Sequence, residues 1–136
     1  MIRAALLAAL LAAPALAQDV QVAQAPGGVV RWLDKVSGEL VDLEIAAGQA
    51  ALKGRLTIRL DECRYPVADP ASNAYAHLTV IDSLNAAPVF AGWMIATSPA
   101  LSALDHPRYD VWVLRCVTPD PAPQPEAETT SEGEGE

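Results

Sequence analysis

The sequence predicts a single small all-β domain over residues 27–116, an antiparallel sandwich or barrel of about six strands with one short helix. Segments such as residues 55–60 alternate apolar and polar residues, which is the period of a strand with one face in the core. Clusters of turn-forming residues separate these segments, as they do in antiparallel sheets. Cys63 and Cys116, the two cysteines of the chain, are expected to close the domain with one disulfide.

The first two expected strands, residues 29–34 and 40–45, form a hairpin. Gly38 lies in the turn between them, where a positive φ angle is favourable. The third expected strand, residues 55–60, points its leucines and isoleucine to one face and its arginines and threonine to the other. Continuing that alternation would turn Cys63 outward, so a β-bulge is expected near Asp61 and Glu62.

The last three expected strands cover residues 76–81, 89–96 and 109–116. The final two are apolar on both faces, which predicts that they are central or covered. Gly92 is expected to mark a bulge or a close backbone approach.

A short helix is expected over residues 98–106, between the last two strands. Ser98 can act as its N-cap and Pro99 suits its first position. Leu101 and Leu104 then lie on one face, so the helix is expected to pack its leucines over the sheet.

The two ends of the chain are predicted to lie outside the domain. Residues 1–17 combine a basic start at Arg3, an apolar run and a small-x-small site, which together are typical of a secretory signal peptide cleaved near Ala17 and Gln18. No later segment is apolar and long enough to cross a membrane, so none is expected in the mature protein. Residues 18–26 are expected to be a flexible lead-in, and residues 117–136 a disordered acidic tail rich in Pro and Glu.

The formal charge of −8 is concentrated in that tail. Six acidic residues follow Cys116, whereas residues 27–116 carry eight basic and ten acidic residues. The basic residues are scattered and form no cluster that could follow a phosphate backbone, so nucleic acid is not an expected partner.

Few residues of the domain suggest chemistry. With both cysteines paired, the two histidines are too few for a zinc site, and neither a metal nor another cofactor is expected. Ser98, His106 and Asp110 leave a hydrolase open as an alternative, because catalytic triads are defined by geometry. The favoured interpretation is a helix cap and a structural histidine, and hence a protein that is not an enzyme.

Aromatic and apolar side chains gather toward the end of the domain and are the candidate contact surface for a partner protein. The candidates are Trp93, Met94, Pro99, His106, Tyr109 and Trp112. Tryptophans in a small domain more often fill the core, so burial of this cluster is the competing interpretation. A further alternative is a small barrel that carries an apolar ligand in an interior cavity.

Three blocks of the chain carry a family resemblance: GGVVRWLDKVSGELVDLEI, GRLTIRLDECRYP and VFAGWMIATSPALSALDHPRYDVWVLRC. In order and spacing they resemble the exported bacterial family known as domain of unknown function 2155, over about residues 28–116. The resemblance implies a periplasmic single-domain protein with one paired cysteine on each side, and it brings no catalytic residues. We therefore expect a non-catalytic envelope protein that acts by binding a partner protein, with its oligomeric state open.

Overall fold

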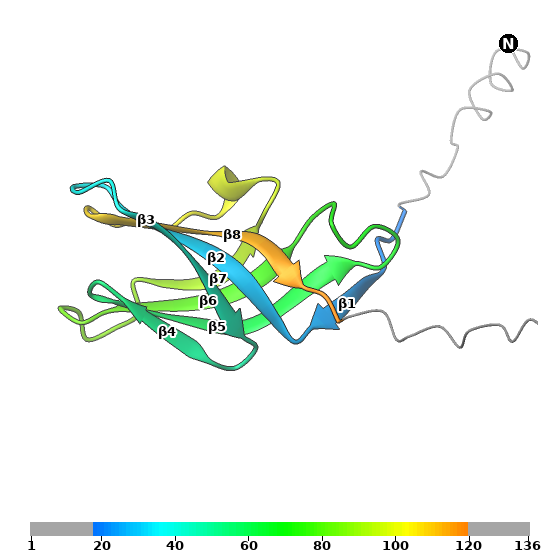
Figure 1. The fold of residues 1–136 in the computed structure, drawn as a ribbon, viewed down its shortest axis with the longest axis horizontal. Helices are drawn as coiled ribbons and strands as arrows, with labels where there is room; N and C mark the ends of the chain where they lie inside the picture. The colour runs from blue at the N-terminus through cyan, green and yellow to red at the C-terminus, as the bar shows by residue number, and fades with distance from the viewer. Residues whose placement is uncertain (1–17, 120–136) are drawn as a thin grey trace, which may run out of the picture.

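Eight strands and one 3-10 turn make up residues 18–119, the part of the chain that the computed structural model describes (Figure 1). The strands are β1 (Val22–Ala25), β2 (Gly27–Asp34), β3 (Leu40–Ala46), β4 (Ala50–Lys53), β5 (Leu56–Pro66), β6 (Tyr75–Asp82), β7 (Phe90–Ile95) and β8 (Tyr109–Val117). The turn, η1, spans Pro99–Leu101. The prediction of an all-β antiparallel fold is therefore confirmed.

The strands divide into two antiparallel sheets. β1, β5, β6 and β7 follow one another in the first sheet, where β4 also pairs with β5, and β3, β2 and β8 form the second. In Figure 1, β3 and β8 lie in the upper layer and β4, β5 and β6 in the lower. Because the sheets stay separate, the fold is a sandwich. The closed barrel that was expected of an apolar-ligand carrier is not formed.

The core consists of the inward-facing side chains of both sheets. Its largest fully buried members are Trp32, Leu56, Ile58, Leu60, Leu78, Met94, Val30, Val80, Val111 and Val113. Burying an aliphatic side chain of this size contributes roughly 1.5–3 kcal/mol relative to leaving it exposed. The ring of Trp32 lies 5.2 Å from the ring of Tyr109, which joins β2 to the start of β8.

The predicted bulge is present in β5. The pairing of β5 with β6 shifts by one residue between Leu60 and Glu62, and this shift turns Cys63 into the core, where it is fully buried. Cys63 forms a disulfide with Cys116 on β8, with a Cα–Cα distance of 5.7 Å. The disulfide prediction is confirmed, and the bond ties the two sheets together.

β4 was not predicted, because its sequence AALK lacks the β-branched and aromatic residues that favour strands. It forms a tight hairpin with β5 that turns at Gly54, whose φ angle is +58°. A Cβ at Gly54 would also lie 3.0 Å from the Trp32 ring and 3.0 Å from the Tyr109 hydroxyl oxygen. Gly38 has the positive φ angle, +77°, that the sequence predicted for the first hairpin.

The flexible lead-in predicted for residues 18–26 is wrong over its second half. Residues 22–25 form β1, which pairs with residues 63–66 of β5. Pro26 follows at once, and the chain then enters β2 in the other sheet. Proline has no N–H to leave unpaired at such a change of sheet, so its position here is favourable.

β7 and β8, predicted to be central or covered, are both edge strands, since within residues 18–119 β7 pairs only with β6 and β8 only with β2. The prediction for Gly92 is also wrong, because the β6–β7 pairing has no irregularity there. A side chain at Gly92 would make only an ordinary contact of 3.6 Å with the ring of Phe90.

The segment that joins β7 to β8, residues 96–108, is the crossover segment. The predicted helix shrinks to the single turn η1, and Ser98 makes no side-chain cap. Leu104 is buried as expected, but Leu101 is 77% exposed. The two leucines do not share a face because the chain leaves helical geometry after Leu101, so η1 buries none of its own residues.

Between residues 18 and 119 no helix is long and apolar enough to cross a membrane. The predicted signal peptide, residues 1–17, lies outside the described residues, as does the predicted tail from residue 120 onward. Of that tail, Val117 instead belongs to β8.

Candidate binding surface

The structure separates the six residues that the sequence proposed as one contact surface. The buried ones are Met94, His106 and Tyr109, which are 1%, 5% and 3% exposed. The ones that reach the surface are Trp93, Pro99 and Trp112. A single continuous surface of all six residues is therefore wrong, because half of them point into the sandwich.

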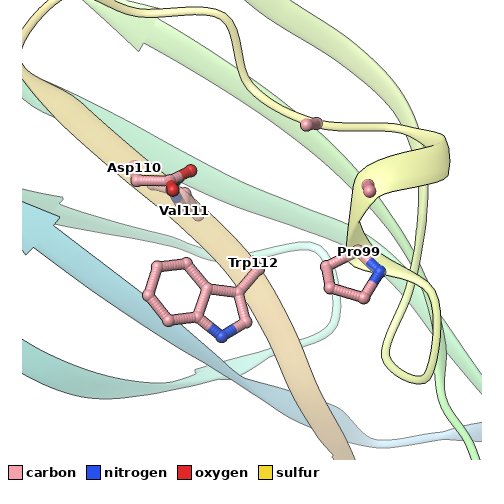
Figure 2. Close-up of a pocket in the computed structure, with 6 residues that line it drawn as sticks. Pro99, Asp110, Val111 and Trp112 are labelled. Atoms are coloured by element: carbon pink, nitrogen blue, oxygen red, sulfur yellow. Dashed lines mark hydrogen bonds between the residues drawn. The ribbon is translucent and has the colours of Figure 1, made fainter.

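Trp112 and Pro99 come together around a surface hollow (Figure 2). Trp112 points outward from β8 because its neighbours Val111 and Val113 fill the core. Figure 2 shows Trp112 on β8 and the Pro99 ring on η1, with the indole extending away from that ring in this view and Asp110 further along the same strand. The hollow has a volume of about 300 Å³, and its remaining lining residues are Ala100, Ala103 and Val111.

The wall of this hollow that η1 forms is apolar and exposed. Pro99, Ala100 and Ala103 are all exposed, and Leu101 stands beside them at 77% exposure. Asp110 supplies the acidic group of the lining, and one of its carboxylate oxygens accepts a hydrogen bond from the Val111 N–H at 2.9 Å. The lining of the hollow thus combines one aromatic side chain, several small apolar side chains and one carboxylate.

Trp93 faces away from this hollow, on the outer face of the first sheet. Its neighbour Met94 is buried between the sheets, so Trp93 points to solvent. The Arg64 guanidinium lies 5.0 Å from the Trp93 ring centre, and the His77 ring meets the indole edge-on at 5.3 Å. Trp93 and Trp112 therefore belong to two different surfaces.

A buried polar cluster holds the far end of the crossover segment. His106 Nε2–H donates to Asp82 Oδ2 at 2.8 Å, and His106 Nδ1 accepts from the N–H groups of Arg108 and Tyr109 at 3.1 and 3.0 Å. Lys35 Nζ donates to the His106 carbonyl at 2.6 Å. The imidazole thus fixes the chain where it enters β8.

The carboxylates of this region are held in the ionised form. Arg55 donates to Asp82 and, with the Leu84 N–H and His106, keeps the pKa of that carboxyl far below its usual range. Arg108 donates to Asp34 at 2.8 Å and lowers the pKa of Asp34 to about 2. Both carboxylates are almost fully buried, so their charges act as fixed anchors for the surrounding loops.

Ser98, His106 and Asp110 do not form a catalytic triad. Both ring nitrogens of His106 are engaged, and Nδ1 already accepts two backbone N–H groups. Asp110 bonds to the Val111 N–H, and within residues 18–119 no hydrogen bond joins His106 to Ser98 or Asp110. In the same residues no group of three His, Cys, Asp or Glu side chains is placed to hold a metal ion.

Sequence reasoning missed the residues that fix the crossover segment. Asp82 and Arg55 lie at the ends of neighbouring strands, and only their pairing in the sheet brings them together. Asp34 and Arg108 are 74 positions apart, so no local sequence pattern could predict that they pair. The one available signal was His106 itself, a histidine that was expected from the sequence to be structural.

These features define the protein as a disulfide-closed all-β sandwich whose crossover segment presents an apolar hollow beside an edge strand. Residues 28–116 match the family described as "Uncharacterized protein conserved in bacteria (DUF2155)". The chain belongs to this bacterial family, and the resemblance drawn from its three sequence blocks is confirmed.

Among curated proteins, the chain is similar to "Uncharacterized protein RP359" of Rickettsia prowazekii (strain Madrid E). The two are 25% identical over 92 residues, which cover 65% of this chain and 59% of the relative. The matched region therefore spans less than two thirds of the relative's length. No solved structure matches the chain.

Proposed function

We propose that this protein is a non-catalytic envelope protein that acts by binding a partner protein at the hollow between Trp112 and η1. The observation that carries this proposal is that η1, with the sequence Pro-Ala-Leu, buries none of its three side chains. The domain itself does not bury the apolar side chains of this turn, so their surface is available to a partner.

The energetic argument rests on Leu101 and its neighbours. Leu101 is 77% exposed, and covering a leucine side chain contributes roughly 1.5–3 kcal/mol. Trp112 is half-buried and lines the hollow, and tryptophan is among the residue types that contribute most at protein interfaces. A partner that fills the hollow and also packs over the exposed side of η1 would therefore remove both residues from water.

The crossover segment holds the hollow in a fixed shape. The Ser98 N–H donates to the Ile95 carbonyl at 3.1 Å on one side of η1, and Leu104 and His106 are buried on the other. Because the segment is anchored before binding, little conformational entropy is lost when a partner docks. This preorganisation favours a binding role.

The chemistry of the lining indicates the kind of partner segment that would fit. The aromatic and small apolar lining residues can pack against an aliphatic side chain. The Asp110 carboxylate can accept hydrogen bonds from a lysine or arginine beside it. The six acidic residues after Cys116 also favour approach by a basic partner. We therefore expect a partner segment with an apolar anchor next to a cation.

The periplasm is the compartment that we propose. A disulfide persists in an oxidising compartment, and the bacterial family of this chain makes the periplasm the natural candidate. The predicted signal peptide at residues 1–17 supports the same location.

Site-specific photocross-linking in living cells tests the proposal. The full chain is expressed in its native bacterium with a photoreactive residue in place of Ala100, and a matched chain carries that residue in place of Val36. Val36 is 76% exposed and lies in the first hairpin turn, far along the chain from the hollow. We expect a covalent adduct from position 100, its loss when Trp112→Ala is added, and none from position 36. Equal adducts at both positions, or monomer alone, would contradict the proposal.

A further inference from the structure

The free edge of β7 carries unpaired backbone groups. Ala96 N–H donates to the Ala74 carbonyl, and this pair lies in the regular β6–β7 register. Hydrogen-bonded pairs recur at every second residue of an antiparallel ladder, so Phe90, Gly92 and Met94 turn their backbone groups toward β6. The alternate residues turn theirs outward.

The outward-turned residues are Ala91, Trp93 and Ile95. Ala91 and Trp93 are exposed, and within residues 18–119 their N–H and C=O groups have no partner strand, because β7 pairs only with β6. The Ile95 carbonyl accepts the Ser98 N–H, which leaves its own N–H on the same edge. A row of unpaired donors and acceptors of this kind is a template for another strand.

The other edge strands all have a feature that discourages pairing. β3 carries Asp42 and Glu44, and β1 and β4 are four residues long. On β8 the Asp110 carboxylate covers the Val111 N–H. β7 has none of these features, since its sequence FAGWMI contains no charge and no proline and its pairing is regular.

We propose that β7 pairs antiparallel with β7 of a second copy of this chain, about a twofold axis at Trp93. In this register Trp93 faces Trp93 of the second copy, and each exchanges backbone hydrogen bonds with the other. Ala91 faces Ile95 of the second copy, and the Ile95 N–H reaches the unpaired Ala91 carbonyl. The first sheets of the two copies then join into one continuous sheet.

Two properties of β7 favour a second copy as the occupant. The facing side chains are complementary in size, because small Ala91 lies opposite larger Ile95 on both sides of the axis. The formal charge of −8 lies mostly after Cys116 and β7 itself is uncharged, so the electrostatic cost of bringing two copies together is small at this strand. Arg64 beside Trp93 is paired with Glu62, so no unbalanced charge faces the axis there.

This inference uses a different surface from the proposed function and stands independently of it. The test is the oligomeric state of the full chain, measured by sedimentation over a range of concentrations. We expect a concentration-dependent dimer. Trp93→Lys is expected to raise the dissociation constant of this dimer roughly tenfold, because the aromatic pair is lost and two lysines would meet directly across the axis. Val36→Lys, at a residue that is 76% exposed in the first hairpin turn, serves as the matched control and should leave the dimer unchanged.

Charge complementation separates self-pairing from other occupants. A mixture of Trp93→Lys and Trp93→Glu chains should recover a dimer that neither variant forms alone, because opposite charges would then face each other at the axis. Ala91→Pro should also prevent dimerisation while the sheet stays folded, since proline removes an N–H that points away from β6. A wild-type chain that remains monomeric would overturn the proposal. So would a dimer that survives these substitutions, or binding of this edge by another protein alone.

Discussion

β7 and β8 are both apolar edge strands with one outward tryptophan, but only β8 is held firmly at both ends. Near the end of β8, Cys116 is joined to Cys63 of β5 by the disulfide. At the start of β8, His106 accepts a hydrogen bond from the Tyr109 N–H. β7 has no cysteine and no charged residue, and it is joined to β6 by the backbone ladder. Similar strand sequences therefore serve two different purposes.

The comparison teaches that anchoring, more than apolar content, decides what an edge strand can offer. The fixed ends of β8 and of the crossover segment keep Trp112 and η1 in place as a side-chain surface. β7 instead offers its backbone, because nothing covers the outward groups of Ala91 and Trp93 among residues 18–119. We therefore assign partner binding to the β8 side and self-pairing to the β7 edge.

Of the changes proposed here, removing the disulfide should have the largest effect on stability, and it should remove the difference in anchoring between β7 and β8. Replacing Cys63 and Cys116 by Ala frees a loop of 53 residues, and the free energy of unfolding should fall by about 4 kcal/mol on the chain-entropy model. Urea denaturation measures the loss, and hydrogen exchange should show that amides of β8 lose more protection than those of β7. An unchanged denaturation midpoint would contradict the role given to the disulfide.

A matched pair of leucine substitutions sharpens the contrast within the crossover segment. Leu104→Ala removes a buried side chain and should cost about 2–3 kcal/mol of unfolding free energy. Leu101→Ala should change it by less than about 0.5 kcal/mol, because that side chain is 77% exposed. Equal losses in thermal or urea unfolding would show that Leu101 supports the domain and is not reserved for a partner.

Removing the His106 imidazole should loosen the start of β8. His106→Ala leaves the N–H groups of Arg108 and Tyr109 without their acceptor, and a buried unpaired group costs about 1–3 kcal/mol. His77→Ala is the control, since the His77 ring is partly exposed on the outer face and is hydrogen-bonded to Asp61; it should cost less than about 1 kcal/mol. The reverse order of these two losses would contradict the assignment of His106 as the anchor.

Acid should weaken the same anchor. The pKa of Asp82 is held far below its usual range and that of Asp34 lies at about 2, so the unfolded chain binds more protons than the folded chain below about pH 4. The stability that these carboxylates provide is complete above that pH and is lost as the pH falls toward 2. Tm measured from pH 7 to pH 2.5 should therefore drop below about pH 4. It should drop less in the variant Asp34→Asn, which has already lost one of the two groups.

The sequence predicted the parts of the fold that depend on local patterns. Alternation placed β2, β3, β5, β6 and β8 close to their observed positions, and the conflict between that alternation and an inward Cys63 predicted the bulge. β1 and β4 were missed because four residues carry too little pattern, and their place is set by pairing with β5. Export and the acidic tail remain predictions about residues that the structure does not describe.

The site was predicted less well, for a physical reason. Spacing alone could not show that Leu104 is buried while Leu101 is exposed. The backbone leaves helical geometry after Leu101, and hydrogen bonds to His106 then set the path of the crossover segment. Apolar residues on both faces of β7 and β8 suggested central strands, whereas one face fills the core and the other carries Trp93 or Trp112. Of the proposed surface, Pro99 and Trp112 are the two residues that share a hollow.

Hydroxyl-radical footprinting tests the binding surface most directly. Side chains of the protein are labelled once in the purified state and once in intact cells, and the extent of labelling is read by mass spectrometry. We expect Leu101 and Trp112 to be labelled in the purified protein and protected in cells, while Val36 is labelled equally in both. Equal labelling of Leu101 in the two states would contradict the claim that a partner covers η1.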